Sequence, residues 1–153
     1  MKIALTGHRS EDCRSEADVR TRVREALSTL PDGPREHVVI CGMANGYDLW
    51  AGTEALRMGC EVWAAKPWAG HGPRVSDVEL YAEVIAGASR VVNVDESEDY
   101  KGPWVYHKRN EWMVDNGTHL LAYWSGKEAG GTYACWKYAQ KHYTQDRIHN
   151  IYG

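Results

Sequence analysis

The sequence has no long apolar run and no apolar leader, and both absences bear on where the protein works. No run approaches the roughly 18 apolar residues that a membrane-spanning helix requires. The N-terminal segment "MKIALTGHRS" has one lysine and three consecutive apolar residues, which is too little for a signal peptide. We therefore expect a cytoplasmic protein that has no membrane partner.

The cysteine and histidine patterns of redox and metal sites are also missing. The four cysteines lie far apart and form no C-x-x-C pair, so we expect free thiols. The seven histidines show no H-E-x-x-H motif or comparable ligand spacing. The sequence predicts neither a metal site nor a resident cofactor.

A basic excess is absent as well. Eighteen Lys and Arg residues against 21 Asp and Glu residues give a formal net charge of −3. Broad electrostatic binding to nucleic acid depends on a positive surface, so the composition disfavours nucleic acid as a partner. Phenylalanine does not occur, and seven tryptophans and nine tyrosines supply aromatic surfaces that also carry a polar atom.

Short apolar runs alternate with amphipathic segments along the whole chain. The runs predict strands at residues 2–6, 37–42, 60–67, 89–94 and 118–124, and residues 147–152 could add a sixth. The segments between them predict helices at residues 15–30, 47–59, 76–87, 106–117 and 132–143. This alternation, with right-handed crossovers, predicts an α/β Rossmann-like fold: a doubly wound, mainly parallel sheet with helices on both faces. Residues 1–153 suit a single domain.

Local signals predict several element boundaries. Ser15 with Asp18, and Ser76 with Glu79, have the spacing of a capping box at a helix start. Pro67 lacks the N–H group that a sheet ladder uses, so we expect the third strand to end there.

Glycine-containing turns follow three of the first five predicted strands. They are "TGHRS", "CGMANGYD" and "WSGKEAGGT", and each leads to a predicted helix. Backbone N–H groups at such turns bind anions, and a doubly wound sheet places its ligand at the carboxyl ends of its strands. The G-x-G-x-x-G fingerprint and the Walker lysine motif are both absent, so a bound phosphate would be held in another manner.

Five segments in the order "TGHR", "GMANGYDLWAGTEAL", "KPW", "RNEWMVD" and "GGT" resemble the SLOG superfamily. That superfamily includes the DNA-processing Smf proteins, the lonely-guy cytokinin-activating hydrolases and small YpsA-like proteins, and the resemblance is closest to the YpsA-like group. It covers nearly the whole chain. It implies a Rossmann-like domain that binds a nucleotide or a nucleotide-derived ligand beside its glycine-rich turns.

The lonely-guy enzymes use an arginine in an R-x-x-x-M helix and a glutamate just after GG-x-GT. Arg109 and Met113 fit the first element, but no carboxylate follows Thr132 at the expected place. Cleavage of a glycosidic bond needs a carboxylate that stabilises the oxocarbenium ion or activates water. The resemblance thus implies Arg109 as a catalytic residue if there is any catalysis, and whether the protein is an enzyme stays open.

The candidate ligand-binding residues lie at the predicted strand ends and in the segments of the resemblance. Asp48 has two interpretations, a carboxylate at a helix start or an acceptor for ribose hydroxyls. The set is Gly7, His8, Arg9, Gly42, Ala44, Asn45, Gly46, Asp48, Lys66, Pro67, Arg109, Asn110, Ser125, Gly126, Gly130, Gly131 and Thr132.

We predict a non-catalytic module that binds a nucleotide or a nucleotide derivative, such as an ADP-ribose or NAD-related molecule. The alternative is a nucleoside 5′-monophosphate phosphoribohydrolase of the lonely-guy type with a rearranged acid, for which Glu128, Asp48 and Glu111 are candidates. Single-stranded DNA binding is a third hypothesis, which the net charge disfavours. The resemblance alone suggests a homo-oligomer.

Overall fold

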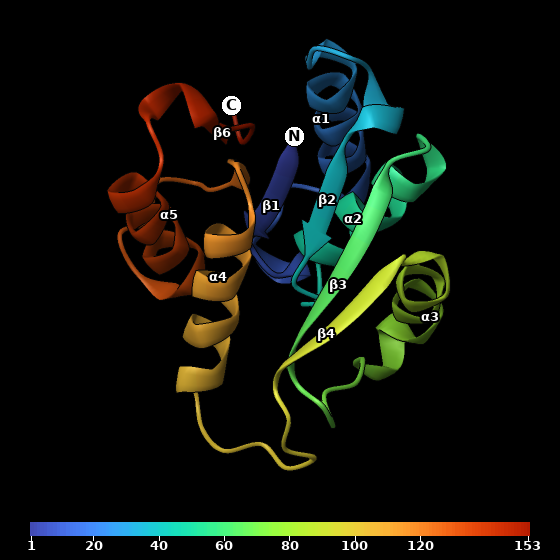
Figure 1. The fold of residues 1–153 in the computed structure, drawn as a ribbon, viewed down its shortest axis with the longest axis vertical. Coiled ribbons are helices and arrows are strands. Elements are labelled where there is room, and N and C mark those ends of the chain that lie inside the picture. The colour runs from blue at the N-terminus through green and yellow to red at the C-terminus, as the bar shows by residue number, and fades with distance from the viewer.

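Six strands form one sheet in the order β4-β3-β2-β1-β5-β6, and every neighbouring pair is parallel (Figure 1). The computed structural model describes residues 1–153. The strands are β1 (Lys2–Gly7), β2 (Val38–Cys41), β3 (Glu61–Trp68), β4 (Arg90–Asp95), β5 (His119–Tyr123) and β6 (Ile148–Asn150). The predicted α/β, doubly wound, parallel architecture is confirmed.

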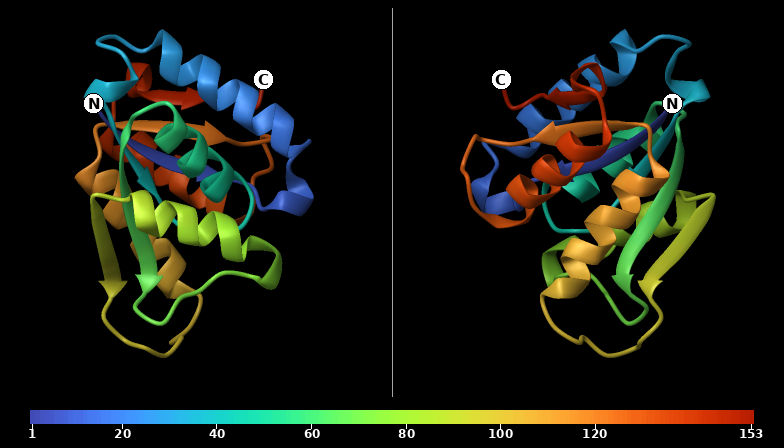
Figure 2. Two further views of the ribbon diagram at one scale, coloured as in Figure 1. Left: turned by 90° about the vertical axis from the view of Figure 1, so that its right-hand side faces the viewer. Right: turned by 60° about the vertical axis from the view of Figure 1, so that its left-hand side comes forward.

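Five helices cover the two faces of the sheet (Figure 2). They are α1 (Glu16–Thr29), α2 (Tyr47–Arg57), α3 (Val78–Gly87), α4 (Trp104–Asn116) and α5 (Gly130–His142). Helices α1 to α3 pack side by side on one face, and α4 packs against α5 on the other. None of these helices has the length and apolar character needed to cross a bilayer.

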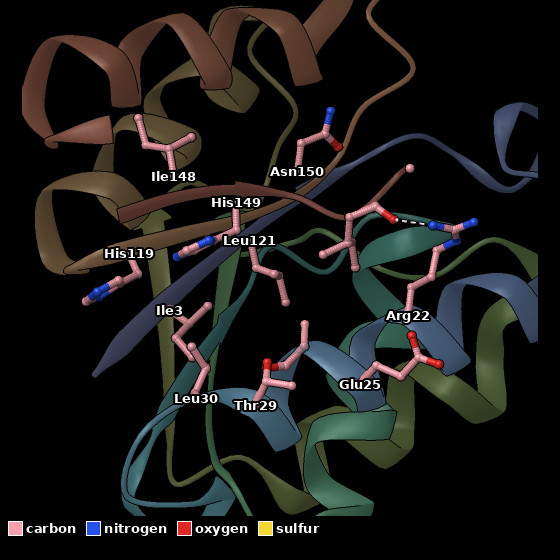
Figure 3. A pocket seen from close by; sticks show the side chains of 13 residues that line it. Ile3, Arg22, Glu25, Thr29, Leu30, His119, Leu121, Ile148, His149 and Asn150 are labelled. Atoms are coloured by element: carbon pink, nitrogen blue, oxygen red, sulfur yellow. Dashed lines mark hydrogen bonds between the residues drawn. The ribbon is translucent and has the colours of Figure 1, made fainter. Parts of the chain in front are cut away.

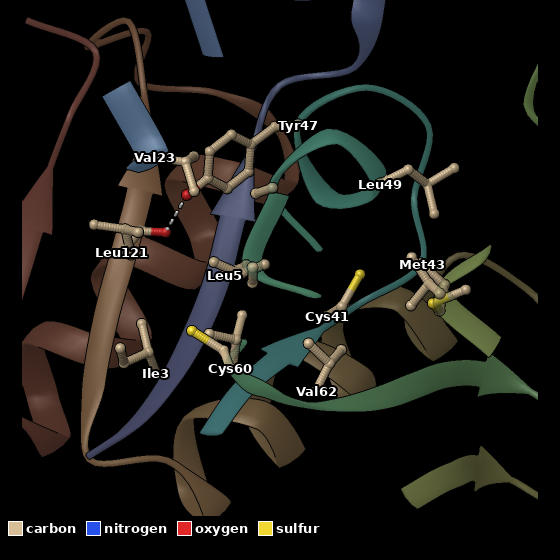
Figure 4. Close-up of a cluster of buried hydrophobic side chains, with 14 of the residues drawn as sticks. Ile3, Leu5, Val23, Cys41, Met43, Tyr47, Leu49, Cys60, Val62 and Leu121 are labelled. Atoms are coloured by element: carbon tan, nitrogen blue, oxygen red, sulfur yellow. Dashed lines mark hydrogen bonds between the residues drawn. The ribbon is translucent and has the colours of Figure 1, made fainter. Parts of the chain in front are cut away.

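Alternating strand residues supply two cores, one on each face of the sheet. Leu5, Cys41 and Val62 point toward α1 and α2 and belong to the larger cluster (Figure 4). Their neighbours Ala4 and Ile40 belong to the smaller cluster under α4 and α5. Because successive side chains of a strand point to opposite faces, a sheet buried on both sides reads as a continuous apolar run.

The order of the strands reverses at β1. The chain runs from β1 through β2 and β3 to β4 in one direction, and then crosses back to place β5 and β6 on the other side of β1. The connections that leave β1 and β5 therefore diverge, which opens a crevice at their carboxyl ends.

At Ser15 the N-cap bond of the predicted capping box forms, although the Asp18 carboxylate bonds to Arg22 and Tyr123 instead of the Ser15 N–H, and the second predicted box does not form. The Ser15 hydroxyl accepts a hydrogen bond from the Asp18 N–H at 3.0 Å, which fixes the start of α1. Ser76 lies inside a short turn at Val75–Asp77, and no side chain caps α3, which begins only at Val78. The prediction for Ser76 and Glu79 is therefore wrong, because the chain makes a separate turn where the helix was expected to begin.

The expectation that Pro67 ends the third strand is also wrong, since β3 continues to Trp68. β2 ends at Cys41 opposite Ala64, so the last part of β3 has only β4 as a neighbour. There β4 pairs with Lys66 and Trp68, and Pro67 falls between these two paired positions. Its missing N–H therefore removes no bond from the ladder.

Candidate functional site

A cavity of about 760 Å³ lies at the carboxyl ends of β1 and β5, where the strand order reverses. Its walls come from the segments that follow β1, β2 and β5 and from the N-terminal halves of α4 and α5. Eleven of the candidate residues line it: Gly7, His8, Arg9, Ala44, Asp48, Arg109, Asn110, Ser125, Gly130, Gly131 and Thr132.

The first turn of α5 opens onto this cavity. Gly130, Gly131 and Thr132 are its first three residues, and no side chain caps the helix at Ala129. Gly130 has φ +90°, and a Cβ atom on Gly130 or Gly131 would meet no other atom within 4 Å. The N–H groups of a first helical turn have no partner inside the helix, so these groups present the positive end of the helix dipole to open space. This arrangement can bind an anion.

Arg109 of α4 is buried, with 6% of the residue exposed, and it lines the same cavity. Its Nη1 donates to the Gly42 carbonyl at 2.7 Å and its Nε to Asn110 Oδ1 at 3.1 Å. Its Nη2 has no hydrogen-bond partner and is not among the fully buried unpartnered atoms, so it keeps some exposure to solvent. The guanidinium is thus oriented by two bonds and keeps donors for a ligand.

Asp48, at the start of α2, is the one buried carboxylate of the cavity. Its Oδ2 accepts a hydrogen bond from the Ala44 N–H at 3.2 Å. Burial raises the pKa of the carboxyl to about 6, and the Arg109 charge and the Ala44 N–H limit the rise. Its Oδ1 has no partner and is not fully buried, so it can accept a ligand hydroxyl or hold a proton near neutral pH.

His8 joins the segments that follow β1 and β5. Its Nε2 accepts a hydrogen bond from the Ser125 N–H at 2.8 Å, which requires that this nitrogen carry no proton. Burial lowers the pKa of His8, Asp12 acts in the opposite direction, and Lys127 lowers it further. The neutral ring therefore holds the loop that leads to α5 in place.

The charge of the cavity is opposite in sign to that of the chain. Arg9, Lys127 and Arg109 line it, against the two carboxylates of Asp12 and Asp48. None of these three cations forms an ion pair, although six other arginines do. A protein with net charge −3 therefore places three cations without an ion-pair partner around this cavity, which favours an anionic ligand.

Six of the candidate residues do not line the cavity, and three of these support it from behind. The Gly42 carbonyl accepts the bond from Arg109. Gly46 has φ +86°, and a Cβ atom there would lie 2.3 Å from the Ser10 nitrogen, so only glycine allows this close approach. Asn45 binds Ser10 and Asp77 with its side-chain amide.

The other three lie farther from the cavity lining. Lys66 donates to the Ala69 carbonyl at 2.6 Å. Pro67 is part of β3, and Gly126 has open space around it without contributing to the cavity wall. The order of segments along the chain could not separate these positions from their neighbours, because the separation depends on side-chain direction.

Nine residues of the lining are absent from the candidate set. Tyr106 and His107 lie within one turn of Arg109 on α4, and Lys127 lies between β5 and the glycines, so local spacing could have suggested them. No local signal points to Tyr152, which follows β6. The nine are Leu5, Thr6, Asp12, Pro103, Tyr106, His107, Lys127, Ala129 and Tyr152.

Of the three carboxylates that could replace the missing catalytic glutamate, only one lies at the cavity. Asp48 lines the cavity, whereas Glu111 and Glu128 are exposed and do not contribute to its walls. No group of three or more His, Cys, Asp or Glu side chains is arranged to hold a metal ion.

A second cavity, of about 710 Å³, lies between α1 and the β5–β6 edge of the sheet (Figure 3). Its floor includes Ile3 and Leu121, and His119 and His149 stack beside it with ring centroids 6.4 Å apart. Arg22 at its rim already binds Asp18 and the Ile151 carbonyl. This cavity therefore offers a ligand no free cation, and the cavity between β1 and β5 is the stronger candidate.

Comparison with known proteins finds similar folds but no matching family model. No family model matches it. The Bacillus subtilis protein described as "Uncharacterized SPbeta prophage-derived protein YoqJ" is 28% identical over 81 residues, which is 47% of each chain.

Solved structures are similar over nearly the whole chain. DNA processing protein A from Helicobacter pylori has a TM-score of 0.69 and 18% identity, covering 92% of this chain and 61% of its own. The Streptococcus pneumoniae protein of that name has a TM-score of 0.67 and 17% identity, covering 92% and 47%. The protein TM1055 has a TM-score of 0.57 and 16% identity, covering 90% and 67%.

These likenesses show a shared Rossmann-like fold. The chain spans about half to two-thirds of the length of these proteins. The fold is consistent with the SLOG resemblance of the sequence motifs, and the closer YpsA-like assignment stays a prediction.

Proposed function

We propose that this chain binds a nucleotide or a nucleotide-derived ligand, of the AMP, ADP-ribose or NAD type, in the cavity between β1 and β5. One observation carries the proposal. The buried Arg109, which keeps an accessible Nη2 and has no carboxylate in ion-pair contact, lines the same cavity as the uncapped first turn of α5. Two independent anion-binding groups, the Arg109 guanidinium and the N–H groups at the start of α5, therefore line one cavity.

Other residues of the cavity could contact the ribose and the base of such a ligand. The free Oδ1 of Asp48 can accept a hydrogen bond from a ribose hydroxyl. Tyr106 offers an aromatic ring to a base. The volume of about 760 Å³ lies within the range of about 300–1,000 Å³ that is typical of small-molecule sites.

Binding without turnover is the reading that we favour. No glutamate follows the glycines of α5, and Asp48 is the only one of the three candidate acids that lines the cavity. Cys135 cannot serve as a ready nucleophile, because burial raises the pKa of its thiol to about 11.

Thermal unfolding in the presence of AMP, ADP, ADP-ribose and NAD tests the proposal. A ligand at a hundredfold excess over its Kd adds about 2.7 kcal/mol to the free energy of unfolding. For a chain of 153 residues we expect a rise in Tm of about 5–10 °C with at least one of the four. The absence of a shift with all four compounds would refute nucleotide binding.

Single-stranded DNA is a second candidate because the Helicobacter pylori DNA processing protein A is described with a single-stranded DNA binding mode. We rank it lower, since the cations lie around one cavity of a chain with net charge −3. Fluorescence anisotropy of a labelled oligonucleotide distinguishes the two. Binding that weakens steeply between about 50 and about 200 mM salt would favour DNA.

A further inference from the structure

Tyr152 reaches the cavity from a part of the chain that is distant in sequence from its other walls. The Ile151 N–H donates to the Ala122 carbonyl at 2.8 Å, which extends the contact of β6 with β5. Asn150 accepts from the Trp124 N–H at 3.1 Å, donates to the Trp124 carbonyl at 2.9 Å, and accepts from the Tyr152 N–H at 3.1 Å. These bonds fix the backbone at Tyr152 against the end of β5.

The ring of Tyr152 is held from three sides. The Arg14 guanidinium lies over it, with Cζ 4.0 Å from the ring centroid. The Tyr123 ring packs against it with centroids 4.9 Å apart, and the His8 ring meets it edge-on at 6.2 Å. A side chain with so many contacts has little rotamer freedom left to lose when a ligand binds.

The hydroxyl of Tyr152 nevertheless has no hydrogen-bond partner. Five other tyrosine hydroxyls bond to protein atoms, those of Tyr47, Tyr81, Tyr123, Tyr138 and Tyr143. The two tyrosines that line the cavity, Tyr106 and Tyr152, make no such bond, and neither hydroxyl is among the fully buried unpartnered atoms. The fold thus fixes the Tyr152 ring and leaves its polar atom to the solvent.

The position of Tyr152 associates it with the anion-binding side of the cavity. Its ring contacts His8, and His8 accepts a hydrogen bond from Ser125, which lies in the loop between β5 and the glycines of α5. Lys127 of that loop lies close enough to lower the pKa of His8. Tyr152 and the first turn of α5 line the same cavity, so the unpartnered hydroxyl of Tyr152 is a candidate donor to a ligand bound there.

We propose that Tyr152 is a ligand-binding residue whose hydroxyl donates a hydrogen bond to the phosphate of the bound nucleotide. The inference rests on the proposed function and adds a residue that none of the sequence motifs contains. Hydrogen bonds to charged groups are among the stronger ones in proteins, so the loss of this one should weaken phosphate binding by about tenfold or more.

The test compares wild-type protein with Tyr152→Phe and with Tyr100→Phe by isothermal titration calorimetry. The phenylalanine at position 152 keeps the ring and its contacts. Tyr100 is 51% exposed, has no hydroxyl partner and does not line the cavity, so Tyr100→Phe is the matched control. The probes are AMP, ADP, ADP-ribose, NAD and adenosine, which has no phosphate.

We expect Tyr152→Phe to raise the Kd of the phosphorylated probe that binds best by about tenfold or more, with an unchanged Kd for adenosine. Tyr100→Phe should match the wild type. Unchanged affinity in Tyr152→Phe, or an equal loss for adenosine, would overturn this inference and leave the proposed function standing. Failure of every phosphorylated probe to bind the wild type would overturn both.

Discussion

The side chain of Asn45 is bound to both carboxylate oxygens of Asp77, with its Nδ2 donating at 2.9 and 3.1 Å. Its Oδ1 accepts from the N–H and the hydroxyl of Ser10, at 3.0 and 2.8 Å. One amide therefore ties the segment after β1 to the segment after β2 and to the turn before α3. Arg9, which lines the cavity, precedes Ser10 directly.

Replacing Asn45 by alanine should destabilise the fold, because the buried Asp77 carboxylate and the Ser10 N–H both lose their partners. We expect the free energy of unfolding in urea to fall by about 1–3 kcal/mol. Asn116→Ala is the control, since Asn116 makes one local bond to the Trp112 carbonyl, and it should cost less. Equal losses in the two variants would contradict the bridging role of Asn45.

Asp48 should make the stability of the protein depend on pH. Its pKa is raised from 3.8 to about 6 in the folded state, so its contribution is fully present below about pH 4 and is lost as the pH rises through about 6. Asp48→Asn keeps an oxygen for the Ala44 N–H and removes the buried charge.

We therefore expect Asp48→Asn to be more stable than the wild type at pH 8, by up to about 3 kcal/mol, and equal to it near pH 4. Urea unfolding at a series of pH values measures the difference. A constant difference from pH 4 to pH 8 would show that the Asp48 carboxyl does not titrate in this range.

An acidic side chain at the start of α5 should block the phosphate position. Gly131→Asp places a carboxylate in the open space before the first turn, where it competes with the anion. We expect the nucleotide-induced rise in Tm to disappear while the Tm without ligand is maintained. Gly72→Asp is the control, because a Cβ atom at Gly72 also meets no atom within 4 Å and Gly72 lies outside the cavity. A rise retained in Gly131→Asp would place the phosphate elsewhere.

Incubation with AMP should return the nucleotide unchanged, because the carboxylate that follows the glycines in lonely-guy enzymes is missing here. Chromatography of the products measures any adenine and ribose 5-phosphate. If adenine appears at enzyme-like rates, the hydrolase alternative is correct. In that case Asp48→Asn should abolish the activity, whereas Glu111→Gln and Glu128→Gln, which alter exposed side chains outside the cavity, should not.

The sequence predicted the elements and the general location of the candidate site. The alternation of short apolar runs with amphipathic segments predicted the mainly parallel sheet, and the capping signal at Ser15 predicted the start of α1. Gly130 and Gly131 indicated a helix start with accessible N–H groups, because glycine has no side chain to cover them. These are properties of short segments, which is why they can be read along a chain.

The tertiary structure alone decided which groups from distant parts of the chain come together. Pro67 is tolerated inside β3 because β2 has already ended, and Asn45 turns to Asp77, which is 32 residues away. Tyr152 meets His8 only because β6 pairs with β5 at the far edge of the sheet. Such contacts depend on strand order and on the direction of each side chain, and both arise from packing between segments that are distant in sequence.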